Sequence, residues 1–291
     1  MCSDTYKHAP IAIYDSGIGG LAIASVIKAL LPQETIHYIG DTKNLPYGEK
    51  RSMALRGYIA QVINFCLSKD YKLLVMACNT ATAAADRFLP SYLKAIGAEI
   101  DIINVIDPVI TYINATNRYN QVGLIGTHYT VSNGIYAERL RTTGIRLTAL
   151  ATPLLVPMVE ACFNGSKIDH LLLDHYLNQI APPHLDALIP ACTHYIFLEK
   201  ALKSFVRAHY PKEIEIIDVA KLTALAVKKF LTAHNLLNTT ERTPLDRFMA
   251  TALTPSFKNA SKKLFGQTPI EINLVNDTQS IDRVCCDRSI V

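Results

Sequence analysis

The chain has 291 residues, of which 49% are apolar and 19% are charged. This length is enough for about two domains with substantial cores, and the composition excludes disordered and fibrous proteins. The formal net charge is only +4, without long runs of like charge, so we expect no nucleic-acid partner.

Membrane and export segments are not expected either. The most apolar long stretch, Leu147 to Phe163, contains two prolines and a glutamate and is shorter than the ~20 residues that span a bilayer. Residues 1–10 are polar and lack the apolar core of a signal peptide. The 7 cysteines include no C-x-x-C pair, and the 9 histidines show no tight ligand spacing. We therefore expect a cytoplasmic protein with free thiols and no metal site.

Short β-branched apolar runs alternate with longer segments of helical period, a pattern typical of βα units and a parallel sheet. In the first half, the predicted strands are 11–14, 35–39 and 73–77, and the predicted helices are 20–31 and 52–68. In the second half, the predicted strands are 122–125, 147–151 and 187–189, each followed by a helical stretch. The pattern predicts an α/β fold made of two similar parallel-sheet domains.

Two stretches of the second half repeat stretches of the first. Ile11-Ala-Ile-Tyr-Asp15-Ser-Gly corresponds to Val122-Gly-Leu-Ile-Gly126-Thr-His, and Met76-Ala-Cys78-Asn-Thr corresponds to Pro190-Ala-Cys192-Thr-His. The separation between Asp15 and Cys78 nearly equals that between Gly126 and Cys192. Two α/β halves related by pseudo-twofold symmetry are the simplest explanation. Each half then has a cysteine at the carboxyl end of its third strand.

The C-terminal part fits neither half cleanly. Its predicted strands are 213–217, 247–251 and 270–275, and its predicted helices are 221–234 and 256–265. These elements could return to complete the sheet of the first half. The predicted domains are then residues 1–104 with 219–291, and residues 105–218, with the active site in the cleft between them. Residues 276–291 show no periodicity and are predicted to be a loose end.

Cys78 and Cys192 are the strongest chemical signal. Each ends an apolar strand and precedes a polar pair that can cap a helix, Asn79-Thr80 or Thr193-His194. A helix start favours a thiolate over a thiol. Singly, either cysteine could be a small buried side chain, which is the commoner case. A symmetric pair instead predicts two thiols that face one another across a cleft.

Opposed thiols suit the inversion of a carbon acid, which needs a base on one face and an acid on the other. A disulfide oxidoreductase would need the two sulfurs in bonding contact. A cysteine hydrolase would need one thiol, a base and an oxyanion hole. His194 could be that base, but Cys78 would then have no role. We interpret His194 as a residue that orients or relays protons.

Three further segments carry polar groups just beyond predicted strands. Gly17–Gly20 opens a helix without the spacing of a dinucleotide-binding loop, and a substrate carboxylate is the better prediction for its N–H groups. Asp15 and Ser16 add a carboxylate and a hydroxyl there. Loop 41–48 is an ordinary polar loop or, given its position, a binding loop. Glu160 is equally well a solvated helix carboxylate or a site residue.

These motifs resemble the cofactor-independent glutamate racemases of the aspartate/glutamate racemase superfamily. The matching segments keep the order of that family: Asp15–Leu21, Gly40–Lys50, Ala77–Ala81, Thr127–Tyr136, Val156–Glu160 and Cys192–Tyr195. The resemblance implies that Cys78 and Cys192 are the acid and the base, assisted by Asp15, Glu160 and His194. It also implies a substrate site made of Asp15, Ser16, Tyr47, Gly48, Asn79, Thr80, Thr193 and His194.

The resemblance further implies interconversion of L- and D-glutamate without a cofactor, which supplies D-glutamate to peptidoglycan synthesis. The family usually has Gly before the second cysteine and Pro after His-Tyr, where this chain has Ala191 and Ile196. Ala191 is expected to tighten the approach to the substrate, and Ile196 removes a rigid residue from a helix start. The alternatives are a racemase for aspartate or another amino acid, and a non-catalytic amino-acid-binding protein of the same fold. The sequence leaves a homodimer open.

Overall fold

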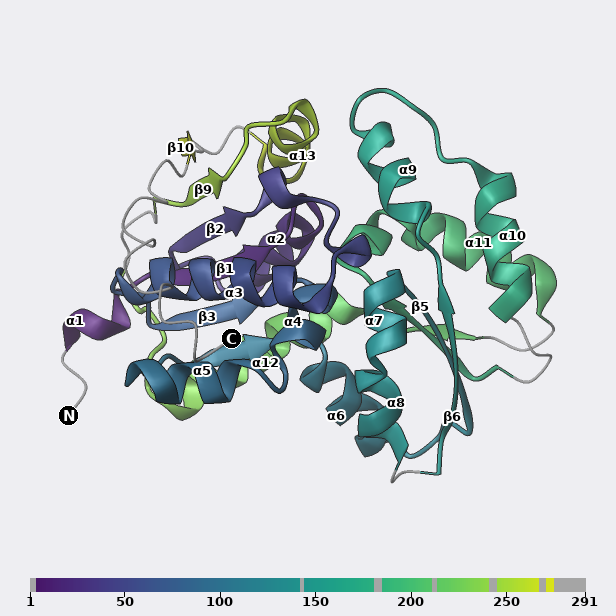
Figure 1. The fold of residues 1–291 in the computed structure, drawn as a ribbon, viewed down its shortest axis with the longest axis horizontal. Helices are drawn as coiled ribbons and strands as arrows, with labels where there is room; N and C mark the ends of the chain where they lie inside the picture. Colours follow the sequence, from purple (N-terminus) through teal and green to yellow (C-terminus); the bar gives the residue numbers. More distant parts are fainter. Residues whose placement is uncertain are drawn as a thin grey trace.

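The computed structural model describes residues 4–141, 144–180, 185–210, 214–240, 245–266 and 271–274. Its strands form one sheet of six strands and one of four, and every strand pair is parallel. The two sheets lie beside one another, each with helices packed on it (Figure 1). The predicted α/β fold with two parallel sheets is thereby confirmed.

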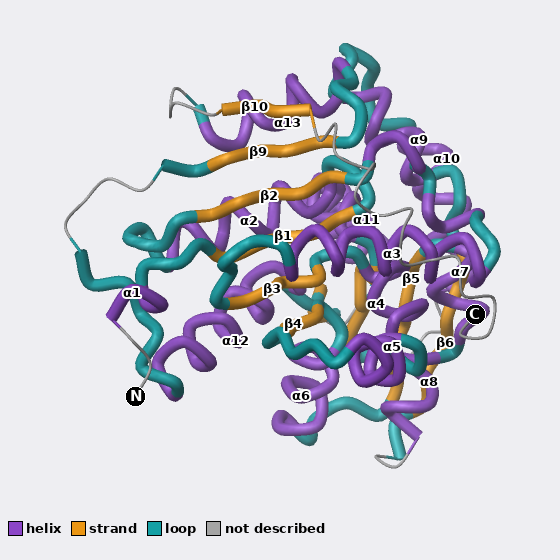
Figure 2. Tube along the Cα trace, turned by 60° about the vertical axis from the view of Figure 1, so that its left-hand side comes forward, coloured by secondary structure: helices purple, strands orange, loops and turns teal. Residues whose placement is uncertain are grey.

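The first sheet has the strand order β10-β9-β2-β1-β3-β4, which Figure 2 shows from top to bottom. Its strands are β1 Ile11–Asp15, β2 Ile36–Gly40, β3 Leu73–Met76, β4 Ile102–Asn104, β9 Arg247–Ala250 and β10 Glu271–Leu274. The helices of this half are α1 Asp4–Lys7, α2 Gly19–Leu30, α3 Ser52–Leu67, α4 Asn79–Ala85, α5 Leu89–Ile96, α12 Val219–Ala233 and α13 Pro255–Phe265. The first five predicted elements are confirmed within one or two residues. The prediction did not include β4, although residues 100–106 are rich in β-branched apolar side chains.

The second sheet has the strand order β6-β5-β7-β8. Its strands are β5 Gln121–Gly126, β6 Arg146–Ala151, β7 Ala187–Ala191 and β8 Glu215–Ile216. The helices are α6 Asp107–Thr116, α7 His128–Asn133, α8 Ile135–Leu140, α9 Leu155–Cys162, α10 His170–Ile180 and α11 Glu199–His209. A 3₁₀ helix, Thr193–Leu198, joins β7 to α11.

The four central strands have the same order in both halves. In the first sheet β2 and β3 flank β1 and β4 follows β3, and in the second sheet β6 and β7 flank β5 and β8 follows β7. This shared order agrees with the predicted duplication. Of the C-terminal strands, only β9 and β10 return to the first sheet, because β8 pairs with β7. The domain boundaries after residues 104 and 218 stay a prediction, and the predicted loose end 276–291 lies outside the described residues.

Alternating side chains of each sheet belong to different cores. Ile11 and Ile13 face a central core that also contains residues of α2, α12 and the second sheet, whereas Ala12 and Tyr14 face α3. A third core packs α9, α10 and α11 on the outer face of the second sheet. Because the central core is shared by the two sheets, the halves are held together by apolar packing.

Several helices begin where a side chain can satisfy a free backbone N–H group. Asp218 accepts a hydrogen bond from Lys221 N at the start of α12, and Thr254 accepts one from Phe257 N at the start of α13. Thr127 does the same for α7. These caps fix where the chain leaves each strand end and turns into a helix.

Candidate active site

A cavity of about 310 Å³ lies between the two halves. It is lined by Ser16, Leu45, Pro46, Tyr47, Gly48, Glu49, Cys78, Asn79, Thr80, Thr127, Pro153, Leu154, Val156, Pro157, Cys192, Thr193 and His194. Each of these segments follows the carboxyl end of β1, β2, β3, β5, β6 or β7. Ligand sites of parallel α/β sheets lie at such strand ends. Two equivalent sets of strand ends therefore build one site.

Cys78 is the N-cap of α4, and its sulfur accepts a hydrogen bond from Ala81 N at 3.4 Å. The same sulfur lies 3.5 Å from Ser16 Oγ. Burial and the nearby Asp15 carboxylate outweigh these two contacts and raise the pKa of Cys78 to about 12. The helix start does favour the thiolate through the Ala81 hydrogen bond, as expected, but desolvation is the larger effect. Cys78 is a thiol at neutral pH.

Cys192 has a different environment at the equivalent strand end. It precedes a 3₁₀ helix, and its sulfur makes no capping hydrogen bond. His194 Nδ1 lies 3.9 Å from Cys192 Sγ, and Nε2 lies 2.8 Å from Glu160 Oε1. Burial alone would lower the pKa of His194, but the hydrogen bonds to Cys192 and Glu160 raise it to about 10. An imidazolium beside Cys192 stabilises a negative charge on that sulfur.

Asp15 lies behind the cavity and not among the residues that line it. Its carboxylate is fully buried and accepts hydrogen bonds from Gly17 N at 2.8 Å and from Thr193 Oγ1 at 3.1 Å. Gly19 also lies against Thr193, since a Cβ on Gly19 would be 2.1 Å from Thr193 Oγ1. Segment 17–20 thus packs closely between the two halves. It does not line the cavity, although the sequence predicted that its N–H groups bind a substrate carboxylate.

The loop after β2 is held by a buried carboxylate. Asp41 accepts a hydrogen bond from Tyr47 at 2.5 Å, and it also accepts one from Thr251 of the returning C-terminal segment at 2.8 Å. The hydroxyls of Tyr47 and Tyr14 are 2.6 Å apart. Burial raises the pKa of Tyr47 well above its usual value, so it remains a phenol. This network fixes Tyr47 and Gly48 against the cavity.

Three threonine hydroxyls connect the halves at the edge of the cavity. Thr80 Oγ1 lies 2.9 Å from Thr127 Oγ1 and 3.3 Å from Thr130 Oγ1, and Thr127 donates to Thr130 at 3.0 Å. All three are buried. Thr127 and Thr130 had no predicted role, although both lie in a segment that resembles the racemase family. Their hydroxyl contacts with Thr80 depend on tertiary structure and leave no spacing signal in the sequence.

The predicted site residues gather closely. Nine of them line the cavity: Ser16, Tyr47, Gly48, Cys78, Asn79, Thr80, Cys192, Thr193 and His194. Asp15 and Glu160 touch residues of the cavity from outside it. An apolar part of the wall consists of Leu45, Pro46, Pro153, Leu154, Val156 and Pro157. The first two belong to loop 41–48, but the sequence reasoning gave no site role to the other four, which lie just before and in the first turn of α9. Apolar residues carry no chemical motif, and only the fold brings them together.

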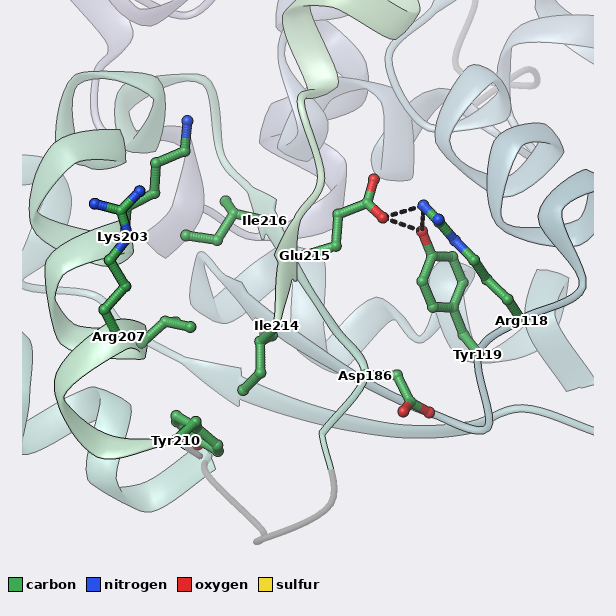
Figure 3. Close-up of a pocket in the computed structure, with 10 residues that line it drawn as sticks. Arg118, Tyr119, Asp186, Lys203, Arg207, Tyr210, Ile214, Glu215 and Ile216 are labelled. Atoms are coloured by element: carbon green, nitrogen blue, oxygen red, sulfur yellow. Dashed lines mark hydrogen bonds and ion pairs between the residues drawn. The ribbon is translucent and has the colours of Figure 1, made fainter. Parts of the chain in front are cut away.

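A second cavity, of about 750 Å³, lies along β8 at the edge of the second sheet (Figure 3). Four of its charged side chains, Arg118, Asp186, Lys203 and Glu215, are engaged with protein groups. Arg118 forms an ion pair with Glu215, and Asp186 accepts hydrogen bonds from backbone N–H groups of residues 120–121 at 2.7 and 2.9 Å. Lys203 pairs with Glu199. No cysteine lines this cavity, and we interpret its polar network as an anchor for β8.

Within the described ranges, no three His, Cys, Asp or Glu side chains come close enough to hold a metal ion. The four cysteines at positions 66, 78, 162 and 192 are free. The helices of the described part of the chain are all too short or too polar to cross a membrane.

Comparison with known proteins identifies the family. No family model matches the chain. A glutamate racemase from Thermus thermophilus is 36% identical over 230 residues, which are 79% of this chain and 82% of that protein. The crystal structure of a glutamate racemase isoform from Bacillus anthracis superposes with a TM-score of 0.82 at 30% identity and covers 93% of this chain and 98% of that one. The chain belongs to the glutamate racemase family.

A solved glutamate racemase also shows a ligand of the family. The enzyme from Francisella tularensis, in complex with D-glutamate, matches with a TM-score of 0.81 at 28% identity and covers 92% of this chain and 98% of that one. The family resemblance based on the sequence motifs is confirmed.

The two departures from the usual glutamate racemase motif lie away from the cavity wall. Ala191 is fully buried in the central core and pairs with Gly126. It does not line the cavity, so the expected tightening around the substrate is wrong. Ile196 packs against the same core from within the 3₁₀ helix.

Proposed function

We propose that this chain interconverts L- and D-glutamate, with Cys78 and Cys192 as the two acid/base groups. The observation that carries the proposal is that two free thiols, at equivalent strand ends of two similar halves, line one small cavity. The D-glutamate in the Francisella tularensis relative supports glutamate as the substrate. The cavity volume of about 310 Å³ is enough for one small amino acid.

The different surroundings of the thiols favour different roles in one direction of the reaction. Cys192, whose sulfur lies 3.9 Å from His194 Nδ1, acts as the base, and Cys78, whose pKa is raised by burial, acts as the acid. In one direction the Cys192 thiolate takes the α-proton from its face of the substrate, and the electron pair of the C–H bond remains on Cα. Cys78 then gives its proton to the opposite face. The products are the inverted amino acid, a Cys192 thiol and a Cys78 thiolate, so one proton must move before the next identical turnover.

The carbanion needs stabilisation of the charge that spreads into its carboxylate. Ser16, Asn79 and Thr80 place side-chain donors around the cavity, and the hydroxyl proton of Thr193 is donated to Asp15. Asp15 and Glu160 act through their contacts with Thr193 and His194. Such fixed donors supply the electrostatic stabilisation in our proposal, which requires neither a metal nor an organic cofactor.

In our proposal the reaction takes place in the cytoplasm and supplies D-glutamate for peptidoglycan synthesis. Two catalytic thiols must stay reduced, which suits a reducing compartment. A homodimer stays a prediction of the sequence.

The test is an optical-rotation assay with both enantiomers of glutamate and of aspartate. We expect racemisation of glutamate and little change with aspartate. Rapid racemisation of aspartate alone would favour the racemase of another amino acid. Calorimetric binding of glutamate without a change in rotation would favour a non-catalytic binding protein.

Replacement of either thiol tests its role within the same assay. Serine is a far weaker base at neutral pH, and each thiol acts in every turnover, so Cys78→Ser and Cys192→Ser should each nearly abolish racemisation. Cys162→Ser is the control, because Cys162 is also a free thiol but does not line the cavity. Near-normal racemisation by either of the first two variants would contradict the proposal.

A further inference from the structure

We propose that Tyr136 is a positioning residue for the substrate carboxylate. Its hydroxyl fixes the side-chain amide of Asn79 so that Nδ2 is free to donate to a carboxylate oxygen in the cavity. The inference rests on the proposed function and adds a residue of the second half that acts through a residue of the first.

The contact between the two side chains is direct and buried. Tyr136 Oη donates to Asn79 Oδ1 at 2.7 Å and so joins α8 to the start of α4. Each residue is 2% exposed. Burial raises the pKa of Tyr136 well above its usual value, so the side chain keeps its proton. That proton needs an acceptor, and in this contact only Oδ1 of the amide provides one.

The other end of the amide has no partner among the described residues. Asn79 Nδ2 is buried and makes no hydrogen bond, and Asn79 lines the cavity. Among the described residues, the other buried side-chain atoms without a hydrogen bond are Glu34 Oε2 and Asp246 Oδ2, which form ion pairs with lysines, and Gln121 Oε1. None of these residues lines this cavity. A buried donor without an acceptor is costly. A carboxylate oxygen of the substrate would satisfy it.

Helix α8 also holds the far end of α4. Arg139 forms ion pairs with Asp86, the C-cap of α4, and with Asp107 at the start of α6. Glu138 pairs with Arg87 at 2.8 Å. Contacts at both ends thus keep α4 in place beneath the cavity. Because Tyr136 and Asn79 come from different halves, the amide is presented only when the halves have this arrangement.

The experiment compares Tyr136→Phe with the wild type in glutamate racemisation. Without the phenolic proton, the amide can turn and the donor is lost in part of the molecules. The carboxylate is already charged in the bound substrate and gains only part of the carbanion charge, so most of the lost contact should appear in binding: we expect KM to rise about 5- to 10-fold and kcat to fall less than about 3-fold. A merely structural role would lower Tm and leave KM unchanged.

Tyr92→Phe is the matched control. Tyr92 Oη donates to Asn64 Oδ1 at 2.8 Å, which is the same pairing of side chains outside the cavity. We expect this variant to keep the wild-type KM. A double-mutant cycle adds Asn79→Ala: if Tyr136 acts through Asn79, then Tyr136→Phe should raise KM no further in the Asn79→Ala background.

A measurement on the wild type tests the inference even if Tyr136→Phe does not fold. The side-chain amide signal of Asn79, assigned in ¹⁵N NMR spectra by its loss in Asn79→Ala, should shift when glutamate saturates the protein. An unshifted signal, or an unchanged KM in folded Tyr136→Phe, would overturn the inference while wild-type racemisation stands. A wild type that neither binds nor racemises glutamate would instead overturn the proposed function, and the inference with it.

Discussion

Nε2 of His194 lies 2.8 Å from the carboxylate of Glu160, which holds the imidazole with its other nitrogen toward the sulfur of Cys192. The sulfur of Cys78 instead contacts Ala81 N and Ser16 Oγ. The pseudo-symmetric positions of Cys78 and Cys192 are therefore chemically different.

Replacement of Glu160 by Gln should weaken this arrangement. The Glu160 carboxylate helps to raise the pKa of His194 to about 10. In the wild type kcat/KM should fall as the pH rises through about 10, because the imidazolium is lost. In Glu160→Gln this fall should move to lower pH. The pH–rate profiles of both proteins give the comparison, and Glu199→Gln, in an exposed ion pair with Lys203, is the control. Superimposable profiles would contradict the role of Glu160.

Stability should depend on pH through the same histidine. The pKa of His194 is about 10 in the folded protein against the ordinary 6.5, so the folded state binds the proton more tightly than the unfolded state. Its contribution to the free energy of unfolding is then full below pH 6.5 and is lost as the pH rises from 6.5 to about 10. Urea denaturation of the wild type and His194→Gln should give a stability difference that shrinks over this range. A constant difference would contradict the raised pKa.

Gly48 should be sensitive to a single methyl group. A Cβ at Gly48 would lie 2.6 Å from Thr127 Cβ, so Gly48→Ala must displace the loop or Thr127. Since both residues line the cavity, we expect kcat/KM to fall about 10- to 100-fold. Gly57→Ala in α3 is the control, because a Cβ there meets nothing within 4 Å and alanine stabilises a helix by up to ~1 kcal/mol relative to glycine. Equal activity of the two variants would count against the tight loop contact.

Thr80 and Thr193 should each contribute a hydroxyl to binding. Thr80→Val and Thr193→Val remove a hydroxyl from the cavity wall without a large change in volume, and Thr193→Val also removes the hydrogen bond to Asp15. A hydrogen bond to a charged group contributes ~1.5–3 kcal/mol, so KM should rise about 10-fold or more. Thr232→Val, which removes a hydroxyl contact on α12 far from the cavity wall, is the control. Wild-type KM and kcat in both cavity variants would argue against their assignment.

The sequence predicted the positions of both thiols because their signal is local and repeated. An apolar strand followed by Cys and two polar residues occurs at Cys78 and again at Cys192. The parallel sheets followed from the same alternation of strand and helix. For the short strand predicted at 213–217, the sequence could not show which strand it pairs with. In the structure this strand, β8, pairs with β7 of the second sheet.

Contacts between distant residues could not be predicted from the sequence. Tyr136 and Asn79 are 57 positions apart, and Asp41 and Thr251 are 210 apart. The degree of desolvation could not be predicted from the sequence either. The helix start at Cys78 was expected to favour a thiolate, but burial of the side chain raises the pKa of Cys78 and outweighs this effect. Side-chain burial of this kind is set by the packed halves together.

The most direct test of two-thiol inversion is the early incorporation of solvent deuterium. With separate thiols, the proton that one sulfur removes stays on that sulfur while the other sulfur, already equilibrated with D₂O, supplies the new hydrogen. Product formed early from L-glutamate should carry deuterium at Cα, and unreacted L-glutamate should carry almost none, with the same asymmetry from D-glutamate. Equal early deuteration of substrate and product, from either enantiomer, would indicate a single base and contradict the account.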